Sequence, residues 1–179
     1  MKVCIIQKGN SVLRDVSKAV SLKDIDTKKI QNIIKDMKET LASYEDGVAI
    51  AAPQISIPLR IFVVSGHIFD SEALENNDKS KKTKDLVFIN PKITKQSKEK
   101  LSMPEGCLSV RHMYGDVKRS IKTTVRAYDE YGNLFTRGAS GLLSQIFQHE
   151  IDHLDGIIFT DKAKNLEKIL PKIEKNNEK

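Results

Sequence analysis

The chain has 179 residues, of which 39% are hydrophobic and 30% are charged, and its formal net charge is +6 at pH 7. This length favours one folded domain, residues 1–179, with a hydrophobic core of its own. No apolar stretch approaches the roughly 18 residues of a membrane-spanning helix, and the first residues lack a signal peptide's apolar run, so we expect neither.

Helices and strands both occur in the first half of the chain. Residues 26–44 are predicted to form an amphipathic helix, because apolar residues recur there every three or four positions. Residues 60–65 and 86–90 are predicted to be short buried strands, and Pro91 is expected to end the second. The stretch 66–85 between them is polar and densely charged, which predicts a mobile insertion loop.

The second half of the chain predicts a hairpin followed by a helix. Residues 123–129 and 134–136 have the character of strands, and the segment 130–133 between them is typical of a hairpin turn. Residues 140–154 carry the apolar spacing of an amphipathic helix. Gly156 follows where a left-handed C-terminal cap is expected, so the helix should end there.

The basic tail at 162–179 holds six lysines and three glutamates. Its apolar residues have helical spacing, which predicts a C-terminal helix that Pro171 interrupts or ends. The order of all these elements predicts an α+β fold. We expect a single domain in which antiparallel or mixed sheets pack around the helix at 140–154, with further helices near both ends.

The segment Gln-His-Glu-Ile-Asp-His at 148–153 carries the strongest chemical signal. His149 and His153 are four residues apart, so on a helix both imidazoles lie on one face and can bind one metal ion. Glu150 is offset by about 100° around the helix, which suits it to handling a proton beside the ion. Two imidazoles on a core-facing stripe need polar partners, and one shared ion satisfies both. Such an arrangement hydrolyses amide-like bonds.

A catalytic metal site typically has three protein ligands, so the two histidines need a third. Phe159 occupies the position of the third histidine in one protease pattern, which excludes that class. Glu167 and Glu174 lie in the lysine-rich tail and are better explained as solvated residues. Cys107 is the strongest candidate because a thiolate binds zinc or ferrous iron well, although a lone buried cysteine is more often a core residue. The other cysteine, Cys4, is expected in a buried strand without a chemical role.

Three segments together resemble the signature motifs of peptide deformylase. They are GVAIAAPQ at 47–54, EGCLS at 105–109 and QHEIDH at 148–153, in that order. The resemblance covers about the last three quarters of the chain. It implies a hydrolase that removes the N-formyl group from the initiator methionine of new polypeptides and releases formate.

The resemblance also implies one divalent metal ion, held by Cys107, His149 and His153. Ferrous iron is the expected native ion, with zinc, nickel or cobalt as substitutes. The ion would activate a water that attacks the formyl carbon, with Glu150 as general base and then general acid. The resemblance also implies two hydrogen-bond donors to the formyl oxygen, on which negative charge develops. They are the side-chain amide of Gln54 and the backbone N–H of Leu108.

The small residues of the first motif suit an extended substrate that runs close to the backbone. The chain departs from the family at Ala49, where a second glycine is usual, so the fit of the substrate backbone is expected to change. The residues expected to bind substrate are Gly47, Val48, Ala49, Glu105 and Gly106.

A second departure follows the cysteine motif. Arg111 and Lys118 stand where many relatives have proline, so we expect residues 111–118 to form a less rigid loop. Arg119 matches a family arginine that pairs with the counterpart of Glu105. That pair would brace the loop that carries the cysteine.

The partners implied by the resemblance are nascent N-formylmethionyl peptides, and we expect a cytoplasmic location. A reducing compartment is more consistent with a thiolate ligand than a disulfide between the two cysteines. The basic tail has two interpretations, a solvated surface helix or electrostatic attraction to ribosomal RNA. No motif supports specific DNA or RNA recognition, and no membrane partner is expected. The sequence makes no prediction of oligomeric state.

Two other functions stay open at this point. An endopeptidase with the same histidine pair would need a third ligand other than Cys107 and would cleave internal peptide bonds. A non-catalytic binding module on a degenerate scaffold is suggested by Ala49 and the altered 111–118 segment. The intact candidate residues, Cys107, His149, Glu150, His153 and Gln54, argue against that module.

Overall fold

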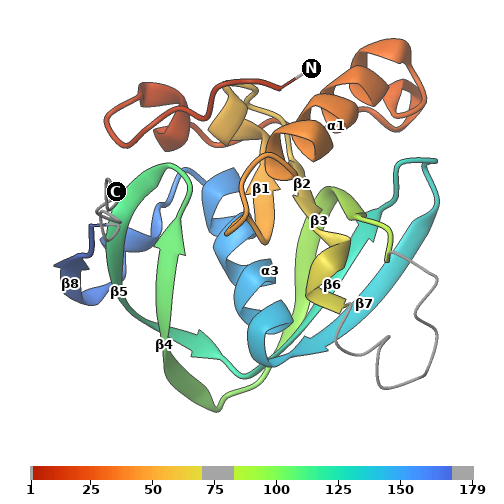
Figure 1. Cartoon of the computed structure of the whole chain (residues 1–179). Helices are drawn as coiled ribbons and strands as arrows, with labels where there is room; N and C mark the ends of the chain where they lie inside the picture. Colours follow the sequence, from red (N-terminus) through yellow and green to blue (C-terminus); the bar gives the residue numbers. More distant parts are fainter. Residues whose placement is uncertain (1, 70–82, 171–179) are drawn as a thin grey trace, which may run out of the picture.

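Two antiparallel sheets pack on either side of one central helix (Figure 1). The computed structural model describes residues 2–69 and 83–170. Its helices and strands, in chain order, are α1 (Lys28–Leu41), β1 (Ala49–Ala51), β2 (Ile61–Val64), β3 (Leu86–Gln96), β4 (Lys100–Cys107), β5 (Val110–Ser120), β6 (Lys122–Tyr128), β7 (Leu134–Ser140), α3 (Gly141–Leu154) and β8 (Lys164–Lys168). The five-stranded sheet has the order β1-β2-β3-β6-β7, and the three-stranded sheet has the order β4-β5-β8. The α+β class and the central helix agree with the prediction from sequence.

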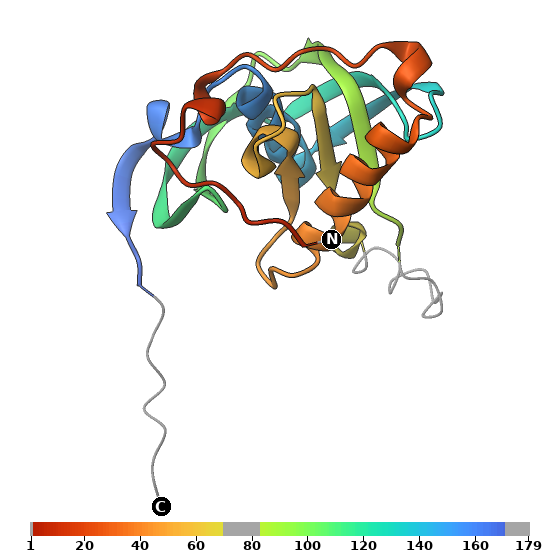
Figure 2. The same ribbon diagram turned by 90° about the horizontal axis from the view of Figure 1, so that it is seen from above.

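The five-stranded sheet packs against a helix on each face, and strand β2 contributes side chains to both contacts. Successive side chains of a strand point to opposite faces, so a fully apolar strand supplies two cores at once. Ile61 and Val63 join the cluster that contains the apolar residues of α1. Phe62 and Val64 join the cluster that contains those of α3. Figure 2 accordingly shows α1, in orange, and α3, in blue, on opposite sides of β1 and β2.

Helix α1 forms where the apolar periodicity predicts it, over a shorter range than 26–44. Thr27 caps its first turn by accepting a hydrogen bond from the N–H of Ile30. Its buried stripe faces the sheet and follows the spacing of a helix face, with Ile30, Ile34, Met37 and Leu41.

Helix α3 carries the histidine pair and ends in a tight turn. Its C-terminal turn closes at Gly156, which has the left-handed φ of 74° that the sequence predicts. A Cβ at Gly156 would lie 2.5 Å from the backbone oxygen of Arg14, so the position has no room for a side chain. The apolar side of α3 packs on the five-stranded sheet through Ile146, Phe147, Ile151 and Leu154.

The prediction of a loop at 111–118 is wrong, because these residues belong to strand β5. Strands β4 and β5 form a long hairpin that closes between Cys107 and Val110, with Leu108 and Ser109 in the turn. The pairing then shifts, and His112 in the bulged segment has a φ of 64°. Bulges of this kind reorient side chains near functional sites.

Three further predictions need correction. Strand β3 does not end at Pro91 but continues to Gln96, because Pro91 lies where the pairing with β6 shifts between Ile89 and Lys92, and strands tolerate proline at such irregularities. Cys4 is an exposed free cysteine outside the strands, not a buried strand residue.

The tail segment at 164–168 is strand β8, which pairs with β5, rather than the predicted helix. Residues 171–179 of the tail, and 70–82 of the predicted insertion loop, lie outside the described residues. Within the described part of the chain, no helix has the length and apolar character needed to cross a membrane.

Candidate metal centre and active site

Cys107, His149 and His153 meet between the end of β4 and the C-terminal half of α3. One ligand atom from each lies within 4.8 Å of the others. The Sγ of Cys107 is 3.2 Å from Nε2 of His153. Sulfur and nitrogen ligands of a tetrahedral ion would be about 3.5 Å apart, given metal bonds of about 2.3 Å and 2.1 Å. The three residues are therefore already near the spacing of ligands to a single ion.

The hydrogen bonding of His149 also suits a metal ligand. Its Nδ1 lies 3.0 Å from a carboxylate oxygen of Glu105, which fixes the tautomer and leaves Nε2 for an ion. Nitrogen and sulfur donors of this kind suit zinc, ferrous iron, cobalt or nickel. The residues present therefore fit a divalent transition metal.

The charges at the site favour the thiolate form of Cys107. Burial opposes its ionisation, but His153 and His149 outweigh burial and lower the thiol pKa to about 5. Burial also opposes the charge on His149, yet hydrogen bonds to Cys107 and Glu105 raise its pKa well above the ordinary value. Since a ligand imidazole must offer a lone pair, metal binding should release the proton that His149 holds.

A buried ion pair positions Glu105 behind His149. Nε and Nη2 of Arg119 donate to the two carboxylate oxygens of Glu105 at 2.6 and 2.9 Å. Burial opposes the Glu105 charge, but Arg119 and His149 lower its pKa to about 2. This is the Arg119–Glu105 pair that the family resemblance implies. Glu105 was expected to bind substrate, but both of its oxygens are occupied by these two partners.

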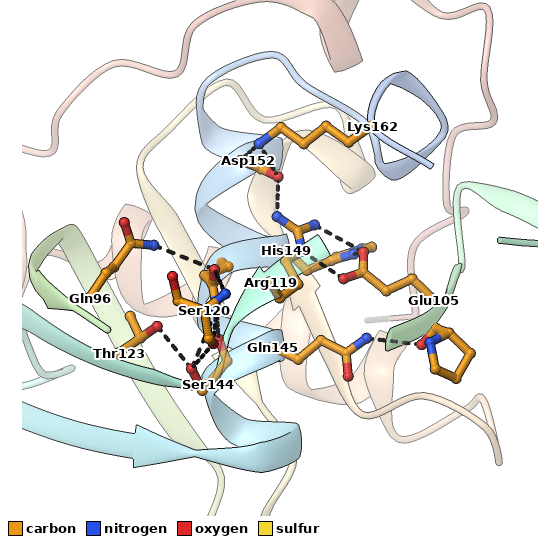
Figure 3. A network of polar contacts seen from close by, with 12 residues as sticks. Gln96, Glu105, Arg119, Ser120, Thr123, Ser144, Gln145, His149, Asp152 and Lys162 are labelled. Atoms are coloured by element: carbon orange, nitrogen blue, oxygen red, sulfur yellow. Dashed lines mark hydrogen bonds and ion pairs between the residues drawn. The ribbon is translucent and has the colours of Figure 1, made fainter. Parts of the chain in front are cut away.

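The ion pair extends through two residues that sequence reasoning missed. Nη1 of Arg119 donates to Asp152 at 2.6 Å, and Nζ of Lys162 donates to the same carboxylate at 2.7 Å. Figure 3 shows this continuous set of contacts from Lys162 to Glu105 and His149. Asp152 lies three residues after His149 on α3, and this helical spacing could have indicated that the two residues lie on the same side of the helix. Lys162 lies ten residues after Asp152, beyond the end of α3, so helix spacing does not predict their contact.

Glu150 is buried beside the ligand pair and lines the same cavity. Burial raises its pKa to about 7, although His149 and His153 act in the opposite direction. Among the described residues its Oε2 has no hydrogen-bond partner. A carboxylate with a free oxygen and a pKa near neutrality is suited to accepting and returning a proton.

Gln54 follows β1 and is buried next to Cys107. Its Oε1 accepts from the N–H of Ala51 at 2.8 Å, which directs Nε2 toward the metal site. Nε2 donates to Oγ of Ser109 at 3.1 Å and lies 3.6 Å from the sulfur of Cys107. Ser109 is thus a further residue of the site that the sequence did not single out. Leu108 follows Cys107 directly in the turn and also lines the cavity.

A cavity of about 520 Å³ opens onto these groups. Of the residues expected to bind substrate, Val48, Ala49, Glu105 and Gly106 line it. Gly47 does not line it, and a Cβ added there would lie 3.0 Å from Leu41 and 3.1 Å from the backbone oxygen of Tyr44. Ala49 has strand backbone without a positive φ, so its methyl group causes no backbone strain. Strand β1 is the edge of its sheet, which leaves one side of its backbone open to another strand.

The comparison with family models decides the assignment. The model described as polypeptide deformylase matches residues 3–169. The chain belongs to the polypeptide deformylase family. It is 39% identical to the peptide deformylase of Christiangramia forsetii over 171 residues, which cover 94% of this chain and 85% of the relative. It is 39% identical to peptide deformylase 2 of Clostridium acetobutylicum, over 85% of this chain and 89% of the relative.

Solved deformylases have the same fold. The deformylase of Synechococcus elongatus in complex with actinonin aligns with a TM-score of 0.77 and 34% identity, over 91% of this chain and 79% of that one. The class I type b deformylase of Acinetobacter baumannii bound to Met-Ala-Ser aligns with a TM-score of 0.78 and 27% identity, over 90% and 98% of the two chains. This family member is therefore a metal-dependent hydrolase that removes the N-formyl group from nascent polypeptides.

Proposed function

We propose that Cys107, His149 and His153 hold one divalent ion and that deformylation takes place beside it. The observation that supports this most directly is the convergence of a sulfur and two imidazoles within 4.8 Å. Ferrous iron is the native ion in this proposal, and zinc, nickel or cobalt can replace it because all accept nitrogen and sulfur ligands. A bound ion of this kind acidifies water and polarises the formyl carbonyl.

Glu150 moves the proton in this proposal. Its free Oε2 takes a proton from the attacking water and later delivers it to the amine nitrogen of methionine, so that formate and a free amino terminus are released. The raised pKa of Glu150 supports both steps, since a carboxylate whose pKa lies above its ordinary value returns a proton more readily than an exposed one.

Gln54 and Leu108 stabilise the formyl oxygen as it becomes negative. The Nε2 of Gln54 is already oriented toward the sulfur of Cys107, and the N–H of Leu108 follows that sulfur in the chain. Preorganised donors of this type are worth about 10²–10³ in rate each. Ser109, which accepts from Gln54, holds the amide in place.

The substrate backbone is proposed to extend along the free edge of β1. Val48, Ala49 and Gly106 line the cavity beside that edge, and the small size of Ala49 and Gly106 permits close approach of an extended peptide. The Acinetobacter baumannii neighbour bound to Met-Ala-Ser supports a peptide of this length as ligand.

An assay with three peptides tests this function. Formyl-Met-Ala-Ser, unformylated Met-Ala-Ser, and a peptide blocked at both ends with only internal bonds available are incubated with anaerobically purified protein. We expect formate from the first peptide alone. Internal cleavage of the third peptide would favour the endopeptidase, and no product from any peptide would favour a non-catalytic module.

We further propose that the reaction takes place in the cytoplasm, where formylated chains emerge, and that the basic tail associates with the ribosome. In the described part of the tail, Lys164 and Lys168 are exposed on β8, which supports electrostatic attraction to RNA. The segment that follows residue 170 carries further lysines.

A further inference from the structure

A second cavity, of about 460 Å³, lies beside α3 and shares none of its described lining residues with the catalytic cavity. The amide side chains of Gln96 and Gln148 line it, and Asp152 is its one acidic residue in the described part of the chain. Its cationic lining residues come from three separate segments, namely Lys100 of β4, Lys118 and Arg119 of β5, and Lys162 after α3. Such a concentration of positive charge in a concave site attracts anions.

Two of these cations belong to the ion-pair network behind the metal site. Three nitrogens of Arg119 donate to Glu105 and Asp152, and the network continues to Lys162 (Figure 3). Lys162 donates to both oxygens of Asp152 at 2.7 Å. A guanidinium has five N–H groups and an ammonium has three. Arg119 therefore keeps two N–H groups, and Lys162 keeps one, for a further acceptor.

The other two cations, Lys100 and Lys118, have no acidic partner among the described residues. Both side chains are exposed, and neither takes part in an ion pair there. In the β4–β5 hairpin Lys100 lies opposite Ser120, two residues beyond Lys118, so the lysines are diagonal neighbours on one face. Like charges at this spacing repel each other, and a bound anion relieves that repulsion.

The edge of β5 adds a backbone donor. The N–H and the carbonyl of Ser120 both contact the side chain of Gln148 on α3, at 3.0 and 2.9 Å. Alternate residues of an antiparallel strand direct their backbone groups to the same edge, so the N–H of Lys118 points to this edge too. Strand β8 pairs with β5 only as far as Asp116, so that N–H has no strand partner there among the described residues. A backbone N–H beside cations is a strong donor to an oxyanion.

The number and charge of these donors match a phosphate group. A phosphomonoester carries about −1.5 to −2 charge at pH 7 and three strong acceptor oxygens. That charge balances the two unpaired lysines, and the oxygens accept from several donors at once, whereas a carboxylate or a chloride ion offers less of both. The cavity is larger than a phosphate group alone, and Ile93 and Val117 add apolar surface to its wall. An organic group attached to the phosphate therefore has room beside them.

We propose that Lys100, Lys118, Arg119 and Lys162 bind a phosphate group in this cavity, either as the free ion or as part of a small phosphomonoester. This site is separate from the metal centre, and the proposal does not depend on deformylation there. Inorganic phosphate and AMP share the recognised chemistry, so they are suitable probes of the two possible sources.

Titration calorimetry with the metal-loaded protein, at an ionic strength held constant with sodium chloride, measures the Kd of each probe. We expect Lys100→Gln/Lys118→Gln to raise the Kd at least about tenfold, because it removes charge-assisted hydrogen bonds to the phosphate oxygens. Lys92→Gln/Lys122→Gln is the matched control. It lowers the net charge equally, at two exposed strand lysines that do not line the cavity. Thermal unfolding without a probe checks that both variants fold.

Equal weakening of binding in the two double variants would assign it to general charge attraction and overturn the site. An unchanged Kd in Lys100→Gln/Lys118→Gln would assign the phosphate to the metal ion, which also overturns the site. Absence of saturable binding to the wild-type protein has the same consequence. If the cavity site holds, tighter binding of AMP identifies a phosphomonoester as the ligand, and equal or tighter binding of inorganic phosphate identifies the free ion.

Discussion

The buried ion pair between Arg119 and Glu105 controls how His149 presents its second ring nitrogen. Both side chains are at most 4% exposed, so neither charge has water as an alternative partner. Removing one member of such a pair leaves an uncompensated buried charge, which typically costs about 3–5 kcal/mol. We therefore expect Arg119→Met to lower the free energy of unfolding of the metal-free protein by about that amount, measured by urea denaturation.

Arg14→Met is the matched control for this prediction. Arg14 pairs with Asp161, but 47% and 36% of their side chains are exposed, and such pairs contribute about 1 kcal/mol or less. Equal losses of stability in the two variants would contradict the role given to the buried pair.

Glu150 is proposed to transfer protons and not to bind the ion. The substitution Glu150→Gln distinguishes proton transfer from metal binding. Glu150→Gln keeps the shape of the side chain but cannot accept a proton. We expect normal metal content by elemental analysis and a fall in kcat of about 10²–10⁴, the usual worth of a general base. Glu99→Gln, a surface change in the loop before β4, is the control. Full turnover in Glu150→Gln would exclude it as the base.

For single residues, the sequence predicts a role in the site when the residues that act together are close in the chain. His149 and His153 are recognisable because helix geometry alone brings them together. Cys107 is only a candidate without the family motif, because its approach to His153 depends on the hairpin. Ser109 lies within the EGCLS motif, but the motif alone does not predict its contact with Gln54, which is 55 residues away in the chain. The contact of Lys162 with Asp152 was also not predicted, because Lys162 lies beyond the end of α3.

Among the helices and strands, the stability of α3 depends on the turn at its C-terminal end. Gly156 combines a left-handed φ with a position where Cβ would collide with the backbone of Arg14. A left-handed conformation alone costs a residue with a side chain about 1–2 kcal/mol. We expect Gly156→Ala to lose more than this, at least about 1 kcal/mol beyond the loss in Gly132→Ala, as measured by urea denaturation.

Gly132 makes this comparison informative because its φ is 82° and nothing lies within 4 Å of the added Cβ. It therefore reports the conformational cost without the collision. Similar losses of stability in the two variants would mean that the turn after α3 relaxes and that the contact with Arg14 is unimportant.

The elements that the sequence failed to predict share a physical cause. In β4 only Glu105 is buried, and in β5 buried, half-buried and exposed residues are mixed, so both strands lack the continuous apolar pattern of a buried strand. In the tail, Leu166, Ile169 and Leu170 have helical spacing, yet they remain 42–62% exposed and do not form a core stripe. Pairing with β5 determines this segment, and such long-range pairing is not visible in local periodicity.

At the scale of the whole molecule, the strongly periodic helices and the fully apolar strand β2 were enough to predict an α+β fold around α3. The sequence predicts sheets around this helix, but it does not predict which strands belong to which sheet. This division depends on the β4–β5 hairpin leaving the five-stranded sheet, and no local pattern marks that point.

The proposed ribosome association belongs to this scale, and the structure sharpens its test. Deleting the whole tail would remove β8 and the contact of Lys162 with Asp152, so a smaller change is preferable. We expect deletion of 171–179 combined with Lys164→Gln and Lys168→Gln to reduce ribosome co-sedimentation and its salt dependence. Each lost lysine–phosphate contact should lower the salt slope by about 0.7–0.9. If ribosome binding is unchanged and insensitive to salt, the tail does not mediate the association.

The most direct test of the central claim is X-ray absorption at the metal edge of the active, anaerobically purified protein. With zinc, the site predicts one sulfur at about 2.3 Å and two imidazole nitrogens at about 2.0–2.1 Å. Cys4→Ser should keep the sulfur signal because Cys4 is exposed and free, whereas Cys107→Ser should lose it. A fully active wild-type protein whose metal spectrum contains no sulfur would contradict the assignment.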